Sequence, residues 1–180
     1  GLVELAATQV VFTIMHASFM PALGVGQACS TLVSKHMGEK RTEKAEKSIK
    51  ESIRFSEYIM GTMGMVFILF PNYILPVFTN DPDVVRVGIV TLRLVGAIQF
   101  IDAVGFTLWF ALSGAGDTFF PAIVESVLVW FFLIPISYLT GVYLDAGYIG
   151  PWLVLSGHIL LFAVIMVWRV LQGKWKEIEV

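Results

Sequence analysis

Asp102 is the residue whose position points most directly to chemistry. It lies well inside a long apolar stretch, Val84–Ser113, close to its middle. A lone carboxylate at that depth in a membrane costs about 2.5–3.5 kcal/mol on insertion scales, and such residues usually mark ion pathways or proton relays. We therefore predict that Asp102 binds the cation, Na⁺ or H⁺, that drives exchange for another solute. The alternative is a structural carboxylate that is hydrogen-bonded between helices.

Three more residues share a helical face with Asp102. Gln99, Phe106 and Trp109 stand three positions before it and four and seven after it, a spacing that places all four on one side of a helix. This face is predicted to line a cavity for an amphipathic organic cation, whose charge the aromatic rings can attract. Ordinary helix packing is an equally good interpretation for Phe106 and Trp109.

The first apolar stretch supplies further candidates. Gln9 and His16 are predicted to line the same substrate cavity, although a lone histidine in a membrane can equally be a neutral hydrogen-bonding group. Pro21 and Gly24 interrupt this stretch, and Pro135 interrupts the fourth one. Proline removes a backbone donor and bends a helix, so these three residues are predicted to form gating kinks, with static kinks as the alternative.

The elements that carry these residues are predicted to be transmembrane helices. The chain has 180 residues, of which 57% are hydrophobic and 14% charged, against about 45–50% and about 25% in soluble domains. Roughly 20 apolar residues suffice to cross a bilayer. We predict an all-α, polytopic bundle that forms one domain over residues 1–180, with five spans: Leu5–Ser34, Ser56–Phe78, Val84–Ser113, Phe119–Tyr143 and Ile149–Leu171.

The distribution of Lys and Arg predicts the orientation. Residues 35–54 hold seven of the 12 basic residues, and Arg169, Lys174 and Lys176 follow the last span. Five spans place both regions on one side, which the positive-inside rule assigns to the cytoplasm of a cell membrane. Ala45, Ile49 and Ile53 recur at helical spacing, so 35–54 is predicted to be a basic amphipathic connector. It either contacts anionic lipid or is simply solvated.

Several classes of function find no support in the sequence. The net charge is −2 and there is no basic tail, so nucleic acid is not an expected partner. Cys29 is the only cysteine, which excludes an internal disulfide and a cysteine metal site. Hydrolase, phosphate-loop and zinc motifs are missing, and an enzyme is not expected. We predict no cofactor besides the coupling ion, and no metal except possible Na⁺ at Asp102.

Several motifs along the chain resemble those of the multidrug and toxic compound extrusion (MATE) family. The strongest is Gln99-Phe100-Ile101-Asp102 followed by Leu112-Ser113-Gly114-Ala115-Gly116-Asp117-Thr118 and Pro121, which is similar to the family's fD…lrGaGdt…P. Weaker matches are Met20–Ala28 in the first span, Trp130, Pro135 and Tyr138 with Gly150 and Trp152, and a C-terminal Arg169…Gly173-Lys174-Trp175. Ser34-Lys35, where Gly-Gln is common, and Pro151 depart from the pattern.

The resemblance implies a specific place in a larger transporter. It aligns the chain with the eighth through twelfth helices of a twelve-helix protein, which is most of the C-terminal six-helix lobe. The N-terminal lobe of the same parent chain would then be the missing partner. Such proteins export drugs or toxic organic compounds in exchange for Na⁺ or H⁺, and the resemblance carries the cation-linked acidic role onto Asp102.

Two other functions stay open at this point. A flippase or exporter of lipid-linked saccharides, from the same superfamily, would favour a more cationic cavity because its cargo is anionic. A channel or membrane scaffold without coupled transport would not need an acid in the middle of the membrane.

Overall fold

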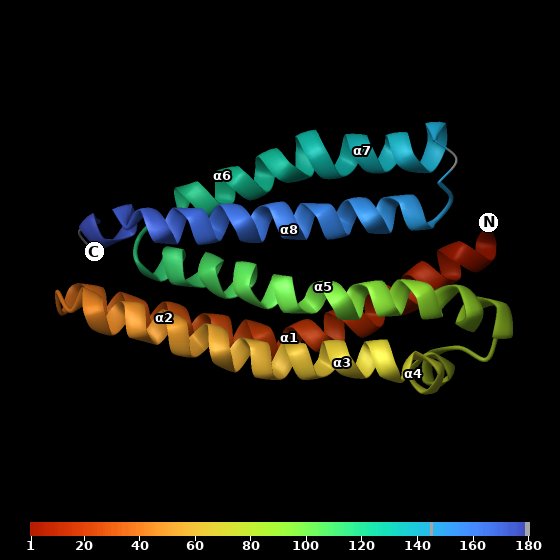
Figure 1. The fold of residues 1–180 in the computed structure, drawn as a ribbon, viewed down its shortest axis with the longest axis horizontal. Helices are drawn as coiled ribbons and strands as arrows, with labels where there is room; N and C mark the ends of the chain where they lie inside the picture. The colour runs from red at the N-terminus through yellow and green to blue at the C-terminus, as the bar shows by residue number, and fades with distance from the viewer. Residues whose placement is uncertain (145, 179–180) are drawn as a thin grey trace.

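A computed structural model describes residues 1–144 and 146–178, and helices make up nearly all of this part of the chain. Four helices are long and apolar enough to cross a membrane, and a bent pair brings the number to as many as five. The predicted helical membrane bundle is therefore confirmed. The spans are α1 (Leu2–Gly38), α5 (Pro82–Gly114), the segment Phe119–Tyr143 and α8 (Ile149–Gln172), with the bent pair between α1 and α5 (Figure 1).

The bent pair joins the basic segment to the second predicted span. Helix α2 (Thr42–Ser56) continues through a wide π-helical turn, η1 (Glu57–Gly61), into α3 (Thr62–Leu69). The basic connector predicted at 35–54 is thus divided: its first four residues complete α1, and most of the rest begins this second long helix. A bend of 90° then separates α3 from α4 (Pro71–Phe78), so the last part of the predicted span Ser56–Phe78 runs in a different direction.

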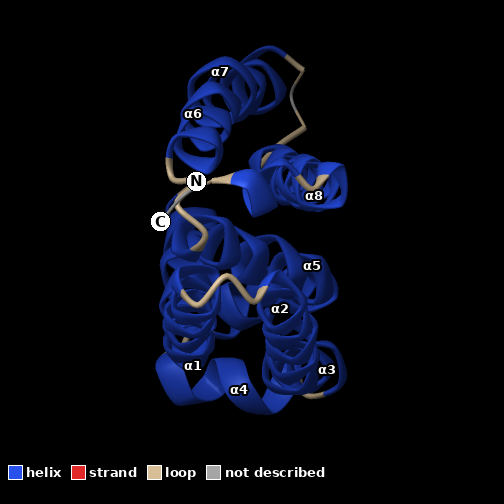
Figure 2. Cartoon of the chain, turned by 90° about the vertical axis from the view of Figure 1, so that its left-hand side faces the viewer, coloured by secondary structure: helices blue, strands red, loops and turns tan. Residues whose placement is uncertain are grey.

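Helix α5 lies at the centre of the bundle. It packs against α1 on one side, α3 on another and α8 on a third (Figure 2). Contact with α3 depends on two glycines: a Cβ on Gly96 would lie 2.6 Å from the carbonyl oxygen of Gly64. Such close backbone approach between small residues is typical of membrane helices. Asp102 therefore stands on the helix with the most neighbours.

The segment Phe119–Tyr143 forms the outer layer, where it packs mainly on α8 (Figure 2). It comprises α6 (Phe119–Val127), η2 (Leu128–Leu133), α7 (Ile134–Tyr138) and η3 (Leu139–Tyr143), with η2 and η3 in π-helical geometry. Trp130 and Phe131 are 67% and 77% exposed, as expected of a lipid-facing surface. Pro135 follows the η2 turn directly, where a wide turn accommodates its missing N–H.

The C-terminal end folds back beside α2. A short 3₁₀ turn, η4 (Lys174–Glu177), buries Trp175, whose Nε1 donates a hydrogen bond to the Val170 carbonyl at 3.0 Å. Lys176 Nζ lies 3.1 Å from Glu46 Oε2, and this ammonium group lowers the pKa of the Glu46 carboxyl. The two basic regions therefore lie at one end of the bundle (Figure 1). Their cytoplasmic location stays a prediction.

Candidate functional site

Asp102 stands in the inner part of α5, far from either end of the helix. At 1.5 Å per residue it lies about 6 Å past the midpoint of this 33-residue helix. Its side chain is only partly exposed. No side chain of residues 1–144 and 146–178 lies within hydrogen-bond or ion-pair distance of its carboxyl group. An unpaired carboxyl group at this depth is free to bind a cation.

A glutamate–histidine pair from two other helices lies near Asp102. Glu125 Oε2, on α6, is 3.6 Å from His158 Nε2, on α8. His158 is only 6% exposed, and neither of its ring nitrogens has a hydrogen-bond partner within the described chain. Helix α6, which carries Glu125, contacts both α5 and α8. Asp102, Glu125 and His158 are therefore titratable side chains on three helices that pack against one another.

Neither Glu125 nor His158 is among the site residues predicted from the sequence. Glu125 is the seventh residue of α6, about 9 Å along the helix from its start, and it turns towards a buried partner. His158 is the only histidine of the last span, so its presence in an apolar stretch was a usable signal. What the sequence did not supply was the pairing, because 33 positions separate the two residues.

Gln99 and Phe106 face α1. The Gln99 Nε2 donates a hydrogen bond of 2.7 Å to Ser18 Oγ, and the Gln99 side chain is 2% exposed. Phe106 packs edge-on against Phe19 with ring centres 5.6 Å apart. In this structure Gln99 is enclosed between helices rather than facing an open cavity. Its Oε1 is buried without a hydrogen-bond partner among residues 1–144 and 146–178, so one acceptor remains for a ligand or a water molecule.

The other predicted cavity residues lie elsewhere. Trp109 packs edge-on against Phe162 of α8, with ring centres 5.7 Å apart. Gln9 and His16 are exposed on α1, and the His16 ring lies 6.5 Å from that of Phe12. The predicted face of α5 is therefore shared between contacts to α1 and to α8. The structure does not bring the six predicted residues into one pocket.

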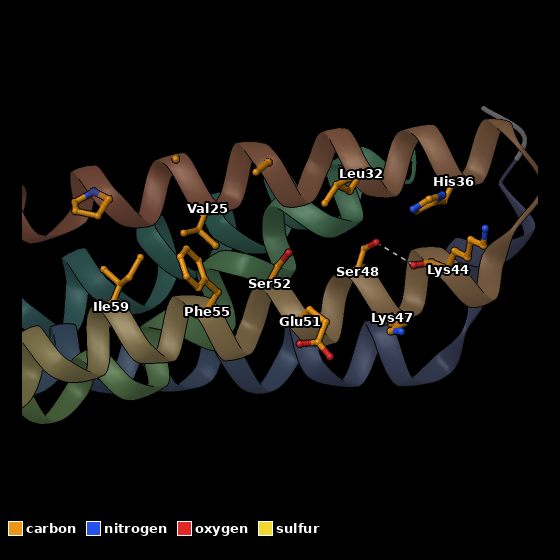
Figure 3. Close-up of a pocket in the computed structure, with 13 residues that line it drawn as sticks. Val25, Leu32, His36, Lys44, Lys47, Ser48, Glu51, Ser52, Phe55 and Ile59 are labelled. Carbon is orange, nitrogen blue, oxygen red and sulfur yellow. Dashed lines mark hydrogen bonds between the residues drawn. The ribbon is translucent and has the colours of Figure 1, made fainter.

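The best-defined hollow lies between α1 and α2 (Figure 3). It has a volume of about 850 Å³, and its walls are apolar except near one end. Pro21 and Gly24, predicted as gating residues, lie on its α1 side, although α1 is a single helix from Leu2 to Gly38. This groove could not be predicted from the sequence, because its shape depends on how α1 and α2 pack against each other.

A buried ion pair fixes the basic end of the bundle. Arg169 Nε, on α8, donates a hydrogen bond of 2.8 Å to Asp117 Oδ2, in the link after α5. The Asp117 side chain is only 8% exposed. The guanidinium group also lies over the ring of Phe120, 4.6 Å from its centre. The Gly-Ala-Gly-Asp-Thr link is thus joined to α8 by charge as well as by packing.

The architecture is that of a helical integral membrane protein, and in such bundles an ionisable side chain far from the helix ends often marks an ion or substrate path. The chain belongs to the MatE family, whose family model matches residues 1–139. This confirms the resemblance drawn from the motifs, and it places the chain among transporters rather than enzymes.

Two curated relatives show how far the sequence similarity extends. The chain is 27% identical over 177 residues to the probable multidrug resistance protein NorM of Thermotoga maritima, which covers 98% of this chain and 38% of that protein. It is 23% identical to multidrug and toxin extrusion protein 2 of Oryctolagus cuniculus, over 98% of this chain and 29% of that protein. This chain therefore spans less than two-fifths of either relative.

Structural similarity supports the fold. The eukaryotic MATE transporter AtDTX14 superposes with a TM-score of 0.90 at 19% identity, over 97% of this chain and 39% of that one. An inward-facing MATE transporter of the MOP superfamily superposes with a TM-score of 0.80 at 17% identity, over 99% of this chain and 43% of that one. At these identities the match concerns the helical arrangement alone.

Proposed function

We propose that this chain forms the ion-coupling part of a secondary antiporter that exports drugs or toxic organic compounds in exchange for Na⁺ or H⁺. The relatives named for multidrug resistance and toxin extrusion support the class of cargo. The observation that carries the proposal is the unpaired carboxyl group of Asp102 inside α5. The rest of the path would come from the remainder of a longer polypeptide in the cell membrane, with the basic end in the cytoplasm.

Exchange follows because the coupling ion and a cationic substrate compete for the negative charge of the same carboxylate. An empty carboxylate in the membrane interior is costly, and a bound cation removes most of that cost. Either the coupling ion or a cationic substrate can supply the positive charge, so binding of one weakens binding of the other. Transport results when each ligand prefers a different conformation of the protein.

The Glu125–His158 pair is a second observation that supports this proposal. It places a second acidic side chain on α6, a helix that contacts α5, and sets that side chain 3.6 Å from the buried His158. An interior rich in carboxylates attracts cationic cargo and repels anionic cargo. This disfavours the alternative of a flippase for lipid-linked saccharides, whose phosphate groups are negative.

The test is ion-driven efflux by the complete polypeptide in sealed vesicles. Ethidium, an organic cation, is enclosed in vesicles whose membrane contains the protein. A gradient of either Na⁺ or H⁺, directed into the vesicles, is then imposed. We expect one of the two gradients to drive ethidium out against its own gradient, and to do so only when protein is present. Movement that only follows the ethidium gradient under both ions would contradict coupled exchange and would favour a channel.

A further inference from the structure

The groove between α1 and α2 runs along both helices. Its α1 wall extends from Pro21 to His36, and its second wall extends from Lys44 in α2 to Ile59 in the middle of η1. Each wall covers 15 residue steps, which corresponds to about 22 Å of helix. One leaflet of a bilayer, headgroups included, is about 20–22 Å thick. The groove therefore has the length of one leaflet.

The lining of the groove changes in character from one end to the other (Figure 3). His36, Lys44 and Lys47 stand at the end nearest the turn between the helices, while the opposite end is lined by apolar side chains such as Val25 and Ile59. This order matches a phospholipid, with an anionic headgroup at the membrane surface and acyl chains in the interior.

Two acidic side chains lie at or beside the groove: Glu39 Oε2 is 3.6 Å from His36 Nδ1, and Glu51 is part of the lining. Glu51 lines the groove but is held 3.0 Å from Arg54, which stands outside it. Its charge is therefore offset locally. Lys44 and Lys47 are both exposed, and no acidic side chain of the described residues lies within ion-pair distance of either.

The apolar part of the groove is unfilled by the chain itself. A Cβ placed on Gly24 meets no atom within 4 Å. Phe55 and Leu32, on opposite walls, remain 59% and 44% exposed. An acyl chain in the membrane can fill apolar space of this kind.

We propose that an anionic glycerophospholipid occupies this groove. Its phosphate lies among His36, Lys44 and Lys47, and an acyl chain runs along Gly24 and Phe55 towards the middle of the membrane. This site is separate from Asp102 and does not depend on the proposed antiport.

The test is lipid retention by the complete polypeptide, measured by native mass spectrometry from detergent that contains equal amounts of dioleoyl phosphatidylglycerol and dioleoyl phosphatidylcholine. We expect the double replacement Lys44→Gln, Lys47→Gln to remove the preference for one bound phosphatidylglycerol. Each basic residue near the surface contributes about fivefold, so the ratio of the two lipids should fall by about 30-fold. The matched control Lys50→Gln, Lys174→Gln removes the same charge outside the groove and should change the ratio little.

A second variant tests the apolar part. Gly24→Leu fills open space without a clash, so it should fold and should reduce the bound lipid by one molecule per polypeptide, whatever the headgroup. Ala17→Leu, exposed on the same helix outside the groove, is its control. Equal retention by Gly24→Leu and Ala17→Leu would overturn the proposal. An unchanged lipid ratio in the Lys44→Gln, Lys47→Gln variant, or a wild-type protein that retains both lipids equally, would overturn the anionic headgroup.

Discussion

Replacement of Asp102 by asparagine is expected to reduce ion-driven efflux by the complete polypeptide by roughly 100-fold, the upper part of the range for coupling between two sites. Asparagine keeps the shape of the side chain but cannot hold a proton or balance a cation. The coupling ion then loses its preference for one conformation, and its gradient no longer biases transport. Because the Asp102 carboxyl group has no described partner, the yield of folded protein should stay unchanged. Ethidium efflux and detergent-extracted yield are measured together.

Asp83→Asn provides the matched control for this experiment. Asp83 stands on the same helix, but its side chain is 64% exposed and lies 3.4 Å from Arg86 at the surface. Its replacement should leave efflux almost unchanged. Glu125→Gln should have an intermediate effect, since it removes a second acidic side chain from the helices that pack against α5. Normal ion-driven efflux by Asp102→Asn would contradict the coupling role. Loss of efflux together with loss of folded protein would support a structural carboxylate instead.

Arg169→Ala is expected to destabilise the protein by about 3–5 kcal/mol, the usual cost of removing one partner from a buried ion pair. Asp117 would keep its charge in a position where water reaches it poorly. The stacking of the guanidinium group on Phe120 would be lost as well. Unfolding of the purified polypeptide in micelles, followed by circular dichroism as denaturant is added, measures the loss.

Two variants show whether the unpaired charge causes this loss. Asp117→Asn combined with Arg169→Gln removes both charges and should restore much of the stability. Arg86→Ala breaks a longer ion pair, of 3.4 Å, at the exposed start of α5, where such pairs contribute about 0–1 kcal/mol. If Arg169→Ala unfolds at the same denaturant concentration as Arg86→Ala, the ion pair does not stabilise this end of the bundle.

The helical bundle was predictable because long apolar stretches in a short chain have few other solutions. The structure differs from the prediction in where one helix continues into the next and where it bends. Charge marks where a helix leaves the membrane but not where it ends, so the basic residues of α2 concealed one helix from Thr42 to Leu69. The bend before α4 had a local signal in Pro71, but its angle of 90° depends on how α4 packs against α5.

The candidate site was predictable only as far as single residues allow. Asp102 was singled out because a carboxylate deep inside an apolar stretch is unusual on its own. The Glu125–His158 pair was missed because it depends on the relative rotation of α6 and α8, which sequence spacing along one helix does not define. Gln99 was correctly grouped with Phe106 on one helical face. Its enclosure against Ser18 depends on α1, which lies 81 positions earlier in the sequence.

Cation release on substrate binding tests the central claim most directly. Purified complete polypeptide is equilibrated in weakly buffered detergent solution with radioactive Na⁺, and ethidium is then added while bound Na⁺ and the pH are recorded. We predict that the wild-type protein releases either Na⁺ or protons as ethidium binds, and that Asp102→Asn binds ethidium without releasing either. Equal release by the two proteins, or ethidium binding by the wild type with no release at all, would contradict coupling through Asp102.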